Sequence, residues 1–203
     1  MQKVDFKKEF SELYKQPRGE VSVVEVPEFN FLKIDGVGDP NTATEFSEAV
    51  ETLYPLAYEI RAIVKETQDV QFVVMPLEGL WWADDMDAFT GGKKDDWQWT
   101  VMIMQPEPVS EAILERAREQ VAEKKAPPRL ADVRFESYDE GLAAQVLHVG
   151  PYTEEGPTIE RLHEFIASQG YTRRGHHHEI YLSDARRTDP EKLKTILRQP
   201  IEE

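Results

Sequence analysis

The chain has 203 residues, no cysteine, and a formal net charge of −15 at pH 7. The lack of cysteine excludes disulfides, thiolate metal sites and a cysteine nucleophile. The acidic balance repels phosphate backbones, so we expect no non-specific binding to nucleic acid.

The N-terminal residues mix charged and apolar side chains and contain no apolar core of signal-peptide length. No window of the sequence reaches 18 uninterrupted apolar residues, the length expected of a membrane span. We therefore expect a cytoplasmic protein with no membrane association. Phe6, Phe10, Leu13 and Tyr14 recur at helical spacing. Residues 1–20 are expected to form an arm or short helix, which is too short for a helix-turn-helix.

The first half of the chain is predicted to fold in the order strand, helix, strand, strand. Runs of β-branched and aromatic residues predict the strands, and apolar residues at helical spacing predict the helix. Pro55 falls inside this helix, where we expect a kink or break. The predicted elements are an extended segment over 21–40 that Pro27 interrupts, a helix capped by Asn41 or Thr42 that runs to about residue 66, strands at 71–83 and 97–106, and a polar loop at 84–96.

The same order recurs in the second half, after a helix at 110–125 that Pro127 and Pro128 end. Its predicted elements are strands at 131–138 and 142–149 around the turn Asp139–Gly141, a helix at 155–169 ended by Gly170, a strand at 176–183, and a last strand, or a short helix leading into one, at 192–201.

A short internal similarity supports a duplication. The segment GVGDP at 36–40 aligns with HVGP at 148–151, and each closes a strand and opens a helix. Two copies of one unit imply a pseudo-twofold axis, with both sheets contributing to one groove. We therefore predict an α+β fold made of duplicated strand-helix-strand-strand modules around a central ligand groove. The whole chain, 1–203, is interpreted as one domain, with an arm (1–20), a first module (21–106), a connecting helix (107–130) and a second module (131–203).

All four tryptophans lie in the strand pair of the first half, as Trp81, Trp82, Trp97 and Trp99. Side chains alternate along a strand, so Trp97 and Trp99 point the same way, whereas Trp81 and Trp82 point in opposite directions. Two interpretations stay open. The rings pack in the core, or at least two of them line a pocket for a flat aromatic molecule or a cation.

The strand around Glu179 alternates between two faces. His177, Glu179 and Tyr181 share one face, while Ile180 and Leu182 share the other, which we expect to meet the helices. A carboxylate among aromatic rings beside a groove can act as a general base or as the counter-ion of a cationic ligand. The alternative is a glutamate on a solvated strand face.

The run His176, His177 and His178 raises the question of a metal site. Consecutive strand residues point to opposite faces, so three in a row cannot converge on one ion. Only His176 with His178 could pair, assisted by His148 or His163. No helical metal-site spacing, P-loop or dinucleotide fingerprint is present. We predict no metal and no cofactor, and the sequence does not predict an oligomeric state.

These residues carry a resemblance to a known family. HVGPYTEEGPTIERLHEFIASQG (148–170), followed by HHHEIYLSDARRTDPEKLKTILRQPI (176–201), resembles the GyrI-like small-molecule-binding family. The opening segment at 3–41 is similar to the longer stand-alone members. The resemblance implies two modules with their helices on one side and a ligand groove between them. Family members include effector domains of multidrug-responsive transcription regulators, a gyrase-inhibitory protein, and cyclopropanoid cyclopropyl hydrolases.

The resemblance implies a small-molecule ligand, aromatic or cationic, while the acidic charge argues against a nucleic acid partner. As a hydrolase the protein would open strained cyclopropyl rings of DNA-alkylating compounds. Glu179 would orient or deprotonate a water molecule, and Tyr152 or Tyr181 would hydrogen-bond the glutamate or the substrate oxygen. The residues expected to contact the ligand are Trp81, Trp82, Trp97, Trp99, His148 and His177.

Two other functions remain open from the sequence. The groove could sequester aromatic cations without chemistry, with Glu179 as counter-ion and the aromatic rings in cation–π contact. The net charge of −15 would attract such cations. Family membership alone would also allow a protein-interaction module that acts on a topoisomerase.

Overall fold

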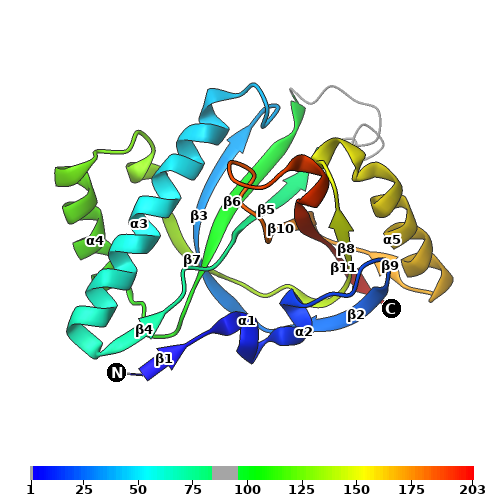
Figure 1. Ribbon diagram of the computed structural model, residues 1–203, viewed down its shortest axis with the longest axis horizontal. Helices are drawn as coiled ribbons and strands as arrows, with labels where there is room; N and C mark the ends of the chain where they lie inside the picture. The colour runs from blue at the N-terminus through cyan, green and yellow to red at the C-terminus, as the bar shows by residue number, and fades with distance from the viewer. Residues whose placement is uncertain (1, 84–95) are drawn as a thin grey trace.

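The computed structural model describes residues 2–83 and 96–203 (Figure 1). Its N-terminal arm begins with a short strand, β1 (Gln2–Val4), and two helical turns, α1 (Phe6–Glu9) and α2 (Ser11–Tyr14). The ring of Phe10 packs against those of Phe6 and Phe29, and Leu13 and Tyr14 are buried. The apolar stripe predicted for the arm therefore fastens it to the rest of the protein.

The elements of the first half follow the predicted order, except that the strand predicted at 71–83 is divided and the predicted helix is not broken. They are β2 (Val21–Val26), β3 (Phe29–Val37), α3 (Thr44–Gln68), β4 (Val70–Phe72), β5 (Leu77–Trp82) and β6 (Gln98–Gln105). The predicted strand at 71–83 is two strands, because Pro76 cannot donate to a ladder. Only β5 joins the large sheet, while β4 pairs in parallel with β1. The loop predicted at 84–96 lies, apart from Asp96, outside the described residues.

Helix α3 runs through Pro55 as one element, so the expected break is absent. Buried side chains flank the proline on both sides: Thr52 and Leu53 before it, Leu56 and Ala57 after it. Because both parts of the helix are fixed in the same core, the local loss of a backbone hydrogen bond at the proline does not end the helix.

The second half contains α4 (Glu111–Lys124), η3 (Leu130–Asp132), β7 (Arg134–Tyr138), β8 (Gly141–Val149), η4 (Tyr152–Glu154), α5 (Gly156–Ser168), β9 (Thr172–Arg173), β10 (His177–Tyr181), η5 (Pro190–Lys192) and β11 (Lys194–Glu202). Both alternatives predicted for 192–201 are combined here, since a short 3₁₀ turn leads into a long strand. The helix predicted at 110–125 is α4, which packs against α3.

The order of strands in the large antiparallel sheet shows the duplication. It reads β2-β8-β11-β10-β5-β6-β3-β7, with β9 attached to β11. Reversing this order exchanges β3 with β8, β6 with β11 and β5 with β10, so the two modules β3-α3-β5-β6 and β8-α5-β10-β11 are related by a pseudo-twofold axis. The outermost strands are exchanged between modules, because β2 pairs with β8 and β7 pairs with β3. The predicted α+β fold with duplicated modules is confirmed.

The internal similarity seen in the sequence has a structural reason. Gly38 and Gly150 both have positive φ angles, 110° and 144°, which favour glycine. Each N–H donates to the carbonyl just before the last strand of its own module: Gly38 to Trp97 at 2.8 Å and Gly150 to Leu193 at 3.0 Å. The repeated glycine thus makes the same strand-to-helix turn in each module.

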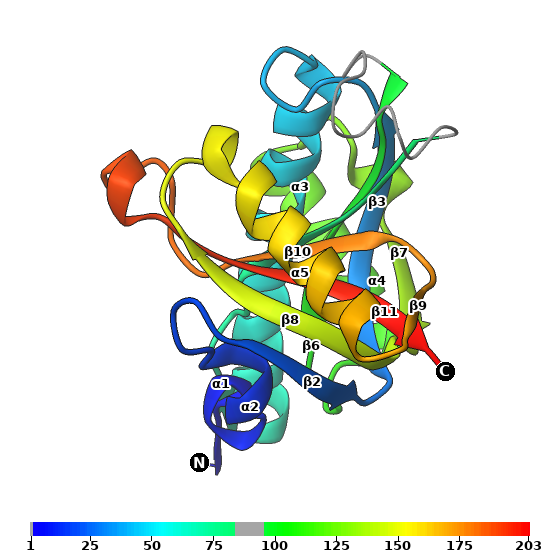
Figure 2. The same cartoon turned by 90° about the vertical axis from the view of Figure 1, so that its right-hand side faces the viewer.

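Helices α3 and α5 lie on the same face of the sheet, one to each side of the central strands β5 and β10 (Figures 1 and 2). Both helices border one cavity, while the arm carries Leu13 and Tyr14 to a buried cluster on the other face of the sheet. Among residues 2–83 and 96–203, no helix combines the length and the apolar character needed to cross a bilayer.

Candidate functional site

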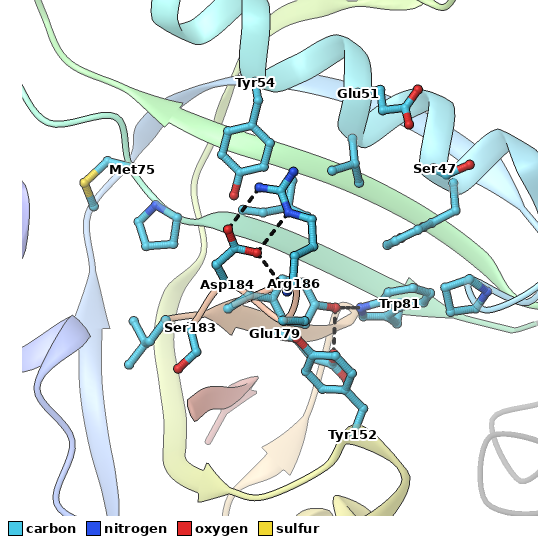
Figure 3. Close-up of a pocket in the computed structure, with 18 of the residues that line it drawn as sticks. Ser47, Glu51, Tyr54, Met75, Trp81, Tyr152, Glu179, Ser183, Asp184 and Arg186 are labelled. Carbon is cyan, nitrogen blue, oxygen red and sulfur yellow. Dashed lines mark hydrogen bonds and ion pairs between the residues drawn. The ribbon is translucent and has the colours of Figure 1, made fainter. Parts of the chain in front are cut away.

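A cavity of about 1880 Å³ lies between the two modules. Its volume exceeds that of a typical pocket for a drug-sized ligand. Helix α3 borders one side and the start of α5 the other. Figure 3 shows α3 facing the turn that carries Tyr152, with β5 and β10 as the floor between them. The side chains that define its inner part are Phe46, Val50 and Tyr54 from α3, Leu77 and Trp81 from β5, Trp97, Tyr152 and Glu155 from the segments next to β6 and α5, and His177, Glu179 and Tyr181 from β10.

Glu179 stands on the cavity floor with both carboxylate oxygens engaged. The Tyr181 hydroxyl donates to Oε2 at 2.7 Å, and Nε2 of His177 lies 3.1 Å from Oε1. A carboxylate oxygen only accepts, so this histidine nitrogen carries the proton of the pair. His177, Glu179 and Tyr181 share one face, as the alternation predicts, whereas His178 and Ile180 are buried on the other. Helices α3 and α5 border the Glu179 face, although the sequence placed the helices on the side of Ile180.

A hydrogen-bonded chain links the first module to Glu179. Nε1 of Trp81 donates to the Tyr181 hydroxyl at 3.1 Å, and that hydroxyl donates to Glu179. The chain passes over Gly79, where a Cβ would lie 2.7 Å from Nε1 of Trp81. Burial, followed by the charge of Glu179, raises the pKa of Tyr181 well above its usual value. Tyr181 is therefore a fixed neutral donor to Glu179.

Glu155 is a second carboxyl group in the cavity, and the sequence analysis did not single it out. It is 5% exposed, lines the cavity with Glu179, and lies beside the Glu179 carboxyl group. Burial and the charge of Glu179 raise the pKa of Glu155 to about 10, so it is a protonated acid at neutral pH. The only signal for it in the sequence is its place at the start of the helix predicted at 155–169. Glutamate is common at that position of a helix, so the sequence does not indicate a functional role.

The four tryptophans divide between cavity and core. Trp81 and Trp97 line the cavity, with ring centroids 6.0 Å apart in an edge-to-face arrangement. Trp99 is fully buried beneath Phe46, and Trp82 stacks on His176 at 4.2 Å. Neither Trp82 nor Trp99 borders the cavity.

His148, expected to contact ligand, does not border the cavity either. Its Nδ1 lies 3.0 Å from the Thr158 hydroxyl, and its Nε2 lies 3.2 Å from the Pro151 carbonyl. These contacts join β8 to the start of α5, the helix that begins just after Glu155. His148 therefore supports the turn that carries Glu155.

Tyr152 lies at the mouth of the cavity, where it is 41% exposed and packs edge-to-face on Tyr181 at 5.7 Å. Partial burial, with the carboxyl groups of Glu155 and Glu179, raises its pKa to about 12. Opposite it, Tyr54 points down from α3 toward Arg186, whose guanidinium makes two bonds of 3.0 Å to Asp184 (Figure 3). The mouth is therefore lined by aromatic rings and an already paired arginine.

The three consecutive histidines have separate environments. His176 stacks on Trp82, His177 contacts Glu179 in the cavity, and His178 lies on the opposite face. Within the described parts of the chain, no group of three or more histidine, aspartate or glutamate side chains could hold a metal ion.

A buried ionic cluster lies under the floor. Oε2 of Glu78 is 2.9 Å from Nε2 of His178, and Oε1 of Glu140 is 2.8 Å from its Nδ1. Two carboxylates that accept from both ring nitrogens require an imidazolium. Arg198 bonds to Glu140 at 3.1 Å and to the Leu13 carbonyl at 3.0 Å. The cluster thus ties β5, β10 and β11 to the arm directly beneath Glu179.

Comparisons with known proteins agree with this architecture. A crystal structure of an uncharacterized conserved protein from Listeria innocua is 40% identical, has a TM-score of 0.88, and matches 98% of this chain and 100% of that one. A crystal structure of a hydrolase from the same organism is 38% identical, with a TM-score of 0.85 over 98% of this chain and 100% of that one. No curated protein matches the chain.

More distant structures share the fold alone. The C-terminal domain of EcmrR is 15% identical, with a TM-score of 0.56 over 91% of this chain and 98% of that one.

The family model of the GyrI-like small molecule binding domain matches residues 19–202, which is nearly the whole chain. The protein is therefore a member of the GyrI-like small-molecule-binding domain family.

Proposed function

We propose that the cavity binds planar aromatic molecules and that the protein hydrolyses the strained cyclopropyl rings of DNA-alkylating compounds, a detoxifying activity. The observation that carries this proposal is the position of Glu179. Its carboxylate is held by Tyr181 and His177 on the floor of a cavity with aromatic walls. A carboxylate held in this way can orient a water molecule and take its proton.

The reaction needs little from the protein, since strain and a conjugated dienone already activate the ring. Water attacks a ring carbon, the carbon–carbon bond breaks, and its electron pair moves into the dienone oxygen to give a phenolate. Glu179 takes the proton of the water, and the phenolate, hydrogen-bonded by Tyr152, takes a proton from the solvent. Trp81 and Trp97 hold the planar part of the substrate in the geometry for attack.

Similarity to other proteins supports an enzyme. Two crystal structures described as those of a hydrolase from Listeria innocua are each 38% identical to this chain, with TM-scores of 0.85 and 0.86. They match at least 98% of this chain. The cavity residues named above therefore belong to a fold that is compatible with hydrolysis.

The alternative function is sequestration of aromatic cations without chemistry. The net charge of −15 favours the approach of cations, and Glu179 with its aromatic neighbours would hold them. A single experiment separates the two. The protein is incubated at substoichiometric concentration with a cyclopropanoid alkylator, and ring opening is followed by absorbance. More than one opened ring per protein indicates turnover, whereas protection that stops at one ligand per protein indicates sequestration.

A further inference from the structure

We propose that the cavity also hydrolyses aryl epoxides, in which a proton must reach the ring oxygen as the ring opens. This inference rests on the role of Glu179 in the proposed function and adds a second group, Glu155, as the proton donor. The two carboxyl groups border the same cavity and both come from the second module, Glu179 from β10 and Glu155 from the turn before α5.

The two carboxyl groups differ in their hydrogen bonds. Both oxygens of Glu179 are engaged, by Tyr181 and His177. By contrast, the side chain of Glu155 interacts with Thr195 and Glu179, yet its Oε1 is buried with no hydrogen bond of good geometry among the residues that the structure describes. Leaving a buried polar atom without a partner is unfavourable, because the hydrogen bond that it made with water is not replaced. An unpartnered carboxyl oxygen in a ligand cavity indicates a group that meets its partner on the ligand.

Glu155 is also the group best able to give up a proton in the cavity. Burial and the neighbouring Glu179 keep it protonated at neutral pH. The Tyr181 proton is already committed to Glu179 at 2.7 Å, and Tyr152 is held at the exposed mouth. A carboxylic acid that stays protonated beside a second carboxyl group that accepts hydrogen bonds forms an arrangement that acid–base catalysis uses.

Cyclopropyl opening makes limited use of such an acid, because its product is a phenolate stabilised by the aromatic ring. Epoxide opening leaves an alkoxide, a much stronger base, and is therefore slow unless the oxygen is protonated during the reaction. A carboxylic acid next to a base, in a cavity that Trp81 and Trp97 also line, suits an oxirane that carries a flat aromatic group.

The step balances within the cavity. The water oxygen bonds to the benzylic carbon while the carbon–oxygen bond of the ring breaks. The electron pair of that bond stays on the ring oxygen, which takes the proton of Glu155, and Glu179 accepts a proton from the water. The product is a vicinal diol. Since Glu155 and Glu179 are neighbours, the proton then passes from Glu179 back to Glu155 and restores the starting state.

The test uses styrene oxide as the probe and measures phenylethanediol by chromatography, with a cyclopropanoid alkylator assayed in parallel. We expect catalytic formation of the diol. Glu155→Gln should lower kcat for styrene oxide at least ~100-fold, as expected for the loss of a general acid, and should lower cyclopropyl turnover less than ~10-fold. Glu154→Gln is the matched control, because its exposed side chain neighbours Glu155 in sequence but does not border the cavity, and both activities should be kept. Thermal unfolding of each variant verifies folding.

The outcomes distinguish this inference from the proposed function. Cyclopropyl turnover without any diol above the uncatalysed rate overturns the inference and leaves the proposed function standing. Equal losses of both activities in a folded Glu155→Gln variant also overturn it, because Glu155 would then act only through structure. Diol formation without cyclopropyl turnover supports the inference and removes the proposed function, and the absence of both activities removes both.

Discussion

Glu179 of β10 pairs directly with Gly79 of β5, and the two residues occupy equivalent positions in the two modules. The pseudo-twofold axis therefore passes between a carboxylate and a residue without a side chain. The empty position is required by the contacts above it, because the Trp81–Tyr181 hydrogen bond crosses Gly79. The axis therefore carries one acidic residue, Glu179. Its counterpart, Gly79, leaves room for the hydrogen bond that holds Tyr181 against Glu179.

Replacing Gly79 with alanine should displace this hydrogen bond. The added Cβ would lie 2.7 Å from Nε1 of Trp81 and 3.2 Å from the Tyr181 hydroxyl. We expect Gly79→Ala to lower ring-opening activity and to cost about 1–3 kcal/mol of unfolding free energy, as overpacking does. Gly156→Ala is the stability control, because a Cβ there meets nothing within 4 Å. Unchanged activity of Gly79→Ala would show that the Trp81–Tyr181 bond is dispensable.

The variant Glu179→Gln tests the carboxylate itself. It keeps the shape of the side chain and removes its charge and basicity. Stability should hold or rise slightly, while turnover or affinity for an aromatic cation falls at least ~10-fold, equal to about 1.4 kcal/mol. The control is Glu164→Gln on the exposed side of α5. If Glu179→Gln unfolds the protein but leaves activity per folded molecule unchanged, Glu179 is a structural residue.

The same variant separates the two functions. If the protein is an enzyme, a neutral aromatic ligand still binds Glu179→Gln and only its chemistry is lost. If the protein sequesters cations, a cationic ligand loses affinity while a neutral one does not. Isothermal titration with one ligand of each charge gives the answer.

Binding of a planar cationic dye should quench tryptophan fluorescence saturably. Trp81 and Trp97 border the cavity, whereas Trp82 stacks on His176 away from it. The quenched fraction should therefore fall in Trp97→Phe and persist in Trp82→Phe. Emission that stays constant up to millimolar dye would remove the aromatic site.

The buried cluster predicts a loss of stability at alkaline pH. Burial alone would lower the pKa of His178, but Glu140 and Glu78 raise it to about 9. A raised pKa stabilises the fold fully below the unfolded value of about 6.5, and this contribution, roughly 3 kcal/mol, is lost as pH rises through 9. Urea unfolding between pH 7 and 9.5 measures the decline. Tyr14 and Tyr138, which face the same cluster, have raised pKa values and stay neutral in this range.

His163 provides the control for this titration. Burial and the neighbouring Arg173 lower its pKa to about 4, so it is neutral throughout the window. His163→Gln should follow the same pH dependence as the original protein. A free energy of unfolding that stays flat from pH 7 to 9.5 would contradict the assignment of an imidazolium to His178.

Residues that follow local rules could be predicted from the sequence. The alternation along β10 placed His177, Glu179 and Tyr181 together, and the repeated Gly38 and Gly150 revealed the duplication. Both features depend on chain geometry over a few residues. They are therefore visible without knowledge of which distant segments meet.

Features that depend on distant packing could not be predicted. Glu155 is close to Glu179 only because the turn before α5 packs over β10, and no periodicity reports that contact. Periodicity likewise could not separate Trp97, which borders the cavity, from Trp99, which shares its strand face and is covered by Phe46. Pro55 led to the wrong expectation of a break in α3 for the same reason. Burial of the helix on both sides of the proline outweighed its local tendency to end a helix.

The exchange of β2 and β7 between modules has a consequence for how the chain reaches this structure. Val21 pairs with Val146, and Phe29 pairs with Tyr138. Each half of the sheet therefore needs a strand that lies more than a hundred residues away in the sequence. Closing such long loops costs entropy before any contact compensates for it, which slows folding. Neither module can complete its sheet alone. A chain cut between β6 and α4 should therefore yield two fragments that acquire native structure only when mixed.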